Sequence, residues 1–141
     1  MNEFSKQEVE RQIRDWKKRI AELYADIQLW LKDTENLLKP GTKYPMYEEP
    51  MYRCGIPKTE MDSAVIVKGK QSILTVIPKG LWVIGTKGRI DILAIKKSYI
   101  LIDAAEFKIT PDWILYNGNL NKGVSLNKQS FLEILDSNSS I

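Results

Sequence analysis

Two aspartates, Asp91 and Asp103, could act together chemically because each lies on one of two neighbouring apolar segments joined by a short turn. If the turn is Lys96-Lys97-Ser98, the segments pair as antiparallel strands and Asp91 faces Asp103 directly. Two ionised carboxylates at cross-strand distance repel each other unless a cation, a basic side chain or a shared proton compensates. Proteins bind magnesium and manganese through carboxylate oxygens, so this pair is a candidate metal site.

The sequence around these aspartates, IDILAI at residues 90–95, a short turn and ILID at residues 100–103, resembles the catalytic hairpin of the PD-(D/E)xK nucleases. That family often begins with a helix and needs no histidine. Its lysine, two positions after the second acid, is replaced here by Ala105, and the triplet Glu106-Phe107-Lys108 follows three residues late. The resemblance implies a metal-dependent phosphodiesterase using Asp91, Asp103, Glu106 and Lys108 with magnesium or manganese. In the alternative interpretation, Arg89, Lys108 or backbone amides satisfy the two acids at the end of a sheet.

The composition excludes several kinds of catalysis. The 141 residues include no histidine, which excludes Ser-His-Asp and Cys-His nucleophilic catalysis and the usual zinc sites. Cys54 is the single cysteine and has no internal disulfide partner, so a reducing compartment such as the cytoplasm is expected. No apolar run approaches membrane-spanning length, and the charged N-terminus from Glu3 onward predicts no signal peptide and no membrane partner.

A long amphipathic helix is predicted over residues 5–39, before Pro40-Gly41. Ser5 and Glu8 have the spacing of a capping box. A four-three alternation then follows at Val9, Ile13, Trp16, Ile20, Leu23, Ile27, Trp30, Thr34 and Leu37. Two interpretations compete: a helix laid across a sheet, and a coiled-coil dimer. We expect the C-terminal half to pack on the sheet and the N-terminal half, with Ile13 and Trp16, to meet a partner in a homo-oligomer.

Residues 40–62 are predicted to form an irregular connector. Prolines at positions 40, 45, 50 and 57 argue against regular structure, and the tripeptide Pro-Met-Tyr occurs at 45–47 and again at 50–52. Two interpretations remain open for Met46, Tyr47, Met51 and Tyr52. They form either a structured loop packed against the helix or a partner-binding surface, which adaptable Met and Tyr side chains suit.

The remaining chain predicts an antiparallel β meander over residues 63–117 and a short helix over residues 126–136, capped by Asn127. The candidate strands are 64–67, 72–77, 81–85, 89–95, 99–104 and 113–116. The strands at 89–95 and 99–104 are apolar on both faces, as in a sheet covered on both sides. The predicted fold is a single α+β domain, with a long N-terminal helix packed on an antiparallel meander of about five to six strands and a short C-terminal helix.

These observations favour a non-enzymatic protein-interaction or self-assembling domain without a cofactor. Its partner is either another protein or a second copy of the chain. Seven basic residues and one acid lie between Ile66 and Ser98, but alternate turns place them at opposite ends of the sheet, so a nucleic-acid surface is not favoured. The competing hypothesis is the metal-dependent phosphodiesterase of the central hairpin.

Overall fold

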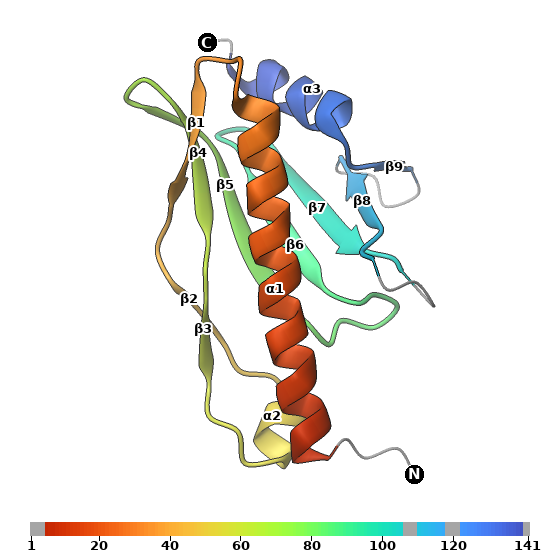
Figure 1. The fold of residues 1–141 in the computed structure, drawn as a ribbon. Coiled ribbons are helices and arrows are strands. Elements are labelled where there is room, and N and C mark those ends of the chain that lie inside the picture. The colour runs from red at the N-terminus through yellow and green to blue at the C-terminus, as the bar shows by residue number, and fades with distance from the viewer. Residues whose placement is uncertain (1–4, 106–109, 118–121, 140–141) are drawn as a thin grey trace.

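The computed structural model covers the whole chain and describes residues 5–105, 110–117 and 122–139. It confirms the α+β fold, with a long N-terminal helix, an antiparallel sheet and a short C-terminal helix. Figure 1 shows α1 in front of the sheet, with α3 beside its C-terminal end. The helices are α1 (Lys6–Leu31), α2 (Glu49–Arg53) and α3 (Lys128–Ser139). The strands are β1 (Asn36–Pro40), β2 (Tyr44–Met46), β3 (Thr59–Met61), β4 (Ala64–Lys68), β5 (Gln71–Gly80), β6 (Arg89–Leu93), β7 (Ser98–Asp103), β8 (Trp113–Tyr116) and β9 (Gly123–Ser125).

Helix α1 begins at the predicted cap. The Ser5 Oγ accepts a hydrogen bond from the Glu8 backbone N–H at 3.1 Å, which satisfies one of the free donors at the helix start. The Glu8 carboxylate does not accept a hydrogen bond from the Ser5 backbone N–H, as it would in a capping box. It accepts hydrogen bonds from Arg11 and Gln12 instead. Of the two hydrogen bonds of the predicted capping box, only the one to the Ser5 hydroxyl is present. The Glu8 carboxylate instead stabilises the exposed side of α1 through Arg11 and Gln12.

Helix α1 ends at Leu31, which corrects the predicted end at residue 39. The Thr34 hydroxyl donates to the Leu31 carbonyl at 2.8 Å and closes the last turn. The chain then forms strand β1, in which Leu37 pairs with Val67 and is 61% exposed. The apolar spacing that suggested helix through Leu37 belongs to a strand, because pairing with the distant β4 outweighs the local periodicity.

The described residues form a seven-stranded antiparallel sheet in the order β1-β4-β5-β6-β7-β8-β9 and a two-stranded ribbon of β2 and β3. The central strand is β6. Pro78 was expected to mark a turn, but β5 continues through it to Gly80 with a bulge. The proline is tolerated because the last β4 pair, Ala64 with Val76, lies before it, so β5 has a paired strand on one side only. Residues 81–85, predicted as a strand, form a loop.

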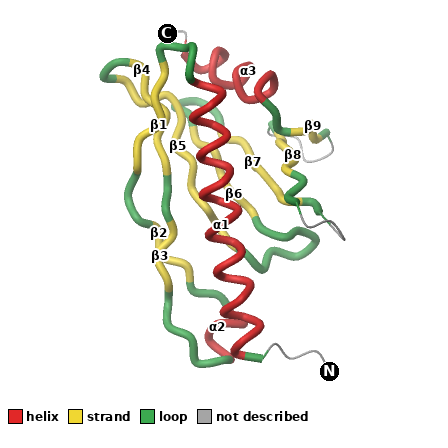
Figure 2. Tube along the Cα trace, viewed as in Figure 1, coloured by secondary structure: helices red, strands yellow, loops and turns green. Residues whose placement is uncertain are grey.

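The connector 40–62 contains three short elements and not the irregular segment predicted. Pro45 lies in β2 and Pro50 in the first turn of α2, where a missing N–H removes no helical hydrogen bond. The tube in Figure 2 shows how β1 leads into β2, and β3 into β4, as one bent pair of chains beside α1. This pair carries α2 to the N-terminal end of α1 (Figure 1).

The core lies between the helices and the sheet face that they cover, which we call the inner face. Inner-face side chains from the central strands are buried: Ile66, Leu74, Val76, Ile90, Ile92, Tyr99, Leu101 and Leu115. The apolar stripe in the N-terminal half of α1 is buried too, and it includes Val9, Ile13 and Trp16. Trp30 of α1 packs on Phe131 of α3, with ring centroids 5.7 Å apart. In the part of the chain that the structure describes, no helix has the length and apolar character to cross a membrane.

Candidate protein-interaction surface

The register of the central hairpin separates the two candidate acids. Asp91 pairs with Ile100, and Arg89 pairs with Ile102. The turn closes where the Ala94 N–H donates to the Lys97 carbonyl at 2.8 Å. The turn is thus centred between Ile95 and Lys96, and not on Lys97 as predicted. An odd shift in register moves every side chain of one strand to the other face, so Asp91 and Asp103 lie on opposite faces of the sheet. This corrects the expectation that they face each other.

Asp103 is buried on the inner face, 2% exposed, and both of its carboxylate oxygens are used. Its Oδ2 accepts a hydrogen bond from Arg19 Nη1 at 2.6 Å. Its Oδ1 accepts from the backbone N–H groups of Ala105 and Asp112, each at 3.0 Å. Arg19 also donates to Asp15 Oδ2 at 2.8 Å and to the Lys87 carbonyl at 2.9 Å. Asp103 therefore ties α1 to the loops at one end of the sheet.

Asp91 lies on the opposite, outer face and pairs with Arg89 of its own strand, Nε to Oδ1 at 2.9 Å. Lys79 Nζ donates to the Tyr44 hydroxyl at 3.0 Å beside this pair. That hydrogen bond raises the pKa of Lys79 above its ordinary value; the Asp91 carboxylate adds to the effect and Arg89 opposes it. A basic side chain satisfies each acid, as the alternative interpretation of the hairpin expected, although for Asp103 the base is Arg19.

The structure does not assemble the predicted metal site from Asp91 and Asp103. Within residues 5–105, 110–117 and 122–139, no group of three Asp, Glu or Cys side chains could hold a metal ion. Glu106 and Lys108, the other two residues of the phosphodiesterase hypothesis, lie outside the described residues.

The outer face of the sheet is the largest feature that the sequence analysis did not assign. It consists of the side chains opposite the inner face, and cross-strand pairs define it because paired residues share a face. Its members are Val65, Val67, Thr75, Ile77, Arg89, Asp91, Leu93, Ile100, Ile102, Ile114 and Tyr116. Among the described elements, both long helices lie on the other side of the sheet (Figure 1). Tyr99, which hydrogen-bonds Asn138 of α3, is an inner-face residue.

The outer face is arranged in two rows across the central strands. One row is Ile77, Asp91, Ile100 and Tyr116, and the next is Arg89, Ile102 and Ile114. An antiparallel sheet with one face in water normally alternates apolar and polar residues. Here apolar residues occupy most positions on both sides. The signal was present in the sequence, since the strands at 89–95 and 99–104 read as covered on both faces.

The residues predicted to bind a partner divide into core and surface. Ile13, Trp16, Met46 and Met51 are buried in the single chain. Tyr47 and Tyr52 are 53% and 69% exposed, and their rings meet edge to face with centroids 6.3 Å apart. The helix stripe and the two methionines therefore offer no free surface, and the two tyrosines remain available.

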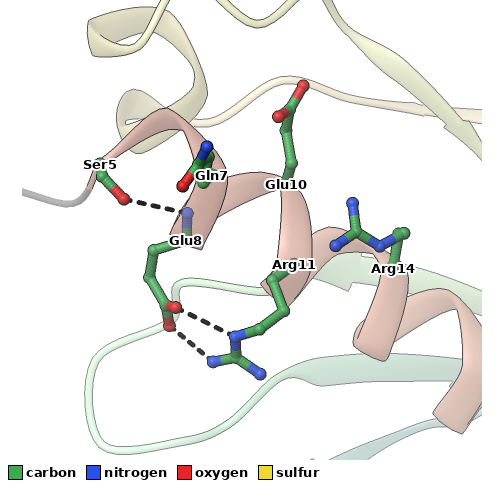
Figure 3. Close-up of a pocket in the computed structure, with 6 residues that line it drawn as sticks. All are labelled: Ser5, Gln7, Glu8, Glu10, Arg11 and Arg14. Atoms are coloured by element: carbon green, nitrogen blue, oxygen red, sulfur yellow. Dashed lines mark hydrogen bonds and ion pairs between the residues drawn. The ribbon is translucent and has the colours of Figure 1, made fainter.

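A depression of about 500 Å³ lies beside the start of α1, lined by Ser5, Gln7, Glu8, Glu10, Arg11 and Arg14 (Figure 3). Hydrogen bonds within it join Ser5, Glu8 and Arg11. Arg11 donates to both Glu8 oxygens, at 3.0 and 2.6 Å, and with Gln12 lowers the pKa of the Glu8 carboxyl to about 2. The depression is an open stretch of helix surface, without the apolar walls of a ligand pocket.

Comparisons with known proteins identify no relative of this chain. No family model matches the chain, and no curated protein or solved structure matches it either. The outer face of the sheet is the candidate interaction surface of the described residues.

Proposed function

We propose that this chain is a non-enzymatic protein-interaction module that binds its partner through the outer face of the sheet. One observation carries the proposal: a sheet that is apolar on both faces has described helices on only one of them. Contiguous apolar surface on a protein commonly marks an interaction site. Removing apolar surface from water contributes about 25 cal/mol per Å², and the outer-face Val and Ile side chains are only partly buried in the single chain, so a partner can bury them further.

The charge of the outer face favours a protein partner over a nucleic acid. Asp91 neutralises Arg89 of the central strand at 2.9 Å, and Lys79 beside this pair donates to the Tyr44 hydroxyl. A phosphate backbone is held by several uncompensated basic side chains. The neighbouring positions are Ile77, Ile100 and Ile102, which offer a phosphate no hydrogen bond. A surface of this composition resembles the apolar centre of a protein interface with an internal ion pair.

Hydroxyl-radical footprinting tests the proposal. Labelling of Tyr116 and Leu93 is compared between dilute purified protein and a concentrated extract of the cells from which the protein comes. We expect these outer-face residues to be protected in the extract. Leu29 on α1, 68% exposed and away from the sheet, is the matched control and should be labelled equally in both. Equal labelling of Tyr116 and Leu93 in both conditions would contradict the proposal.

A further inference from the structure

We infer that the partner seated on the outer face is a second copy of this chain, related by a two-fold axis that runs across the strands. The inference rests on the proposed function and adds the identity and geometry of the partner. A two-fold interface brings the same patch of both copies together, so the patch must complement itself. The outer face can be tested for this residue by residue, because its register is known.

The ion pair lies at the middle of the sheet. Strand β6 carries Arg89 and Asp91 and has three strands on each side. When two such faces meet, the direction of a two-fold axis in the interface decides which charges of β6 meet. An axis along β6 places Arg89 over the partner's Arg89 and Asp91 over the partner's Asp91, which repel. An axis across the strands places Arg89 over the partner's Asp91, and its repeat does the same.

The apolar residues fit the same axis. It passes between the two outer rows, at the level of Ile90 in β6 and Leu101 in β7. Each row then lies over the other row of the second copy. Ile100 meets the partner's Ile102, and Tyr116 meets the partner's Ile114. Apolar side chains therefore face apolar side chains in β7 and β8, and in β5 Ile77 lies over the partner's Gly80, the residue that pairs with Arg89. This arrangement gives the self-complementarity that a two-fold interface requires.

The size of the face sets the expected strength. The axis lies at the level of Ile90, whereas β1 and β4 reach only the level of Ile92, so within the sheet β5 to β9 lie over their own copies. Strands about 4.8 Å apart and residues about 3.4 Å apart make this overlap roughly 20 Å wide and five residues about 17 Å long. The two copies together then bury on the order of 700 Å², which is the size of a weak, transient contact. We expect a dimer that dissociates in the micromolar range.

Charge reversal in mixed pairs tests whether the Arg89–Asp91 pair lies in the interface. Arg89→Asp gives a copy with two acids at the centre of the face, and Asp91→Arg gives a copy with two bases. Each variant alone should dissociate at least tenfold more readily than the wild type, because like charges meet across the axis. An equimolar mixture should associate again, because acids then meet bases. Sedimentation equilibrium from 1 to 200 µM measures all three, with circular dichroism as the check on folding.

A second experiment keeps the native charges, so it remains informative if a charge variant does not fold. Ile100→Cys and Ile102→Cys are made separately in a Cys54→Ser background. Under mild oxidation the mixture should form disulfide-linked dimer faster than either variant alone. A wild-type chain that stays monomeric at 200 µM would overturn the inference. So would equal crosslinking of the mixture and the single variants, or folded charge variants that fail to associate when mixed. A monomer whose Tyr116 is nevertheless protected in the extract would leave the proposed function intact.

Discussion

Arg19 of α1 donates a hydrogen bond to Asp103 of β7 at 2.6 Å, across a separation of 84 positions in the chain. Both side chains are buried, and Arg19 also lies over the Trp16 ring, 4.9 Å from its centroid. Trp16 in turn packs on Trp113 of β8, with ring centroids 6.1 Å apart. The charged pair and the two indoles therefore join the middle of the helix to the end of the sheet as one unit.

Asp103→Asn should destabilise the protein strongly. The amide retains one oxygen for the backbone N–H groups of Ala105 and Asp112, but it turns an N–H₂ toward Arg19 and removes the buried carboxylate partner of that charge. Arg19 then keeps only the half-exposed Asp15 as an ion-pair partner. Breaking a buried ion pair from one side costs about 3–5 kcal/mol. At about 2–4 °C per kcal/mol for a chain of this length, the melting temperature should fall by at least 6 °C or so.

Asp15→Asn is the matched control because it removes the other carboxylate that contacts Arg19. The Asp15 side chain is half exposed, and exposed pairs contribute about 1 kcal/mol or less. Urea unfolding of both variants measures the difference. Equal losses for Asp15→Asn and Asp103→Asn would mean that burial does not set the strength of this network.

Gly88→Ala should be poorly tolerated. Gly88 has φ 142°, and a Cβ there would lie 2.3 Å from the Trp16 ring, which is itself buried and cannot move aside. Overpacking of about 1–3 kcal/mol adds to backbone strain of similar size. Gly69→Ala is the control: its φ is 63°, no atom lies within 4 Å, and strain alone should cost about 1–2 kcal/mol. Similar thermal shifts in both variants would contradict the clash with Trp16.

The methionines and tyrosines of the connector should respond differently to truncation. Met51 is completely buried, so Met51→Ala should cost about 2–5 kcal/mol. Tyr52 is 69% exposed and its ring meets that of Tyr47, so Tyr52→Ala should cost about 1 kcal/mol or less. Thermal unfolding compares them. A large loss for Tyr52→Ala would place that ring in the core and remove it from any partner surface.

Acid should weaken the start of α1 through Glu8. Hydrogen bonds from Arg11 and then Gln12 lower the pKa of its carboxyl from 4.5 to about 2. A lowered folded pKa means that the stabilisation is fully present above pH 4.5 and is lost as the pH falls to about 2. Glu8→Gln should therefore lose less stability than the wild type over this window. The control is Glu10→Gln, whose carboxylate hydrogen-bonds no described residue; the melting temperature against pH measures all three. A Glu8→Gln profile that overlays the wild type would contradict this origin of the acid sensitivity.

The features of the fold that could be predicted from the sequence are those that local sequence patterns control. The helix start at Ser5 and the order of sheet and helices all follow from caps, periodicity and turn residues. The cap of α3 follows in the same way, with Asn127 Oδ1 accepting from the Ser130 N–H at 2.9 Å. What the sequence could not predict depends on pairing between distant segments. Residues 36–40 read as helix until β4 is available to pair with them.

The position of the hairpin turn had the largest effect on the predicted functional site. Residue types alone favour Lys96-Lys97-Ser98 as the turn, with Ile95 in the strand, whereas the turn that forms is centred between Ile95 and Lys96. They differ by an odd number of positions in the register of β7, and this difference decides whether Asp91 and Asp103 meet or lie on opposite faces. The same shift decides that Ile100 and Ile102 belong to the outer face.

The contacts of α1 also determine when during synthesis this helix can complete its packing. Helix α1 precedes the other described elements in the sequence, but several of its partners come much later. Arg19 hydrogen-bonds Lys87 and Asp103, Trp16 packs on Trp113 of β8, and Trp30 packs on Phe131 of α3. During synthesis these side chains lack those partners until the chain has been made through Phe131. A nascent chain stalled before β8 would therefore leave Trp16 and Trp30 available to chaperones, so α1 is among the last elements to be fully packed.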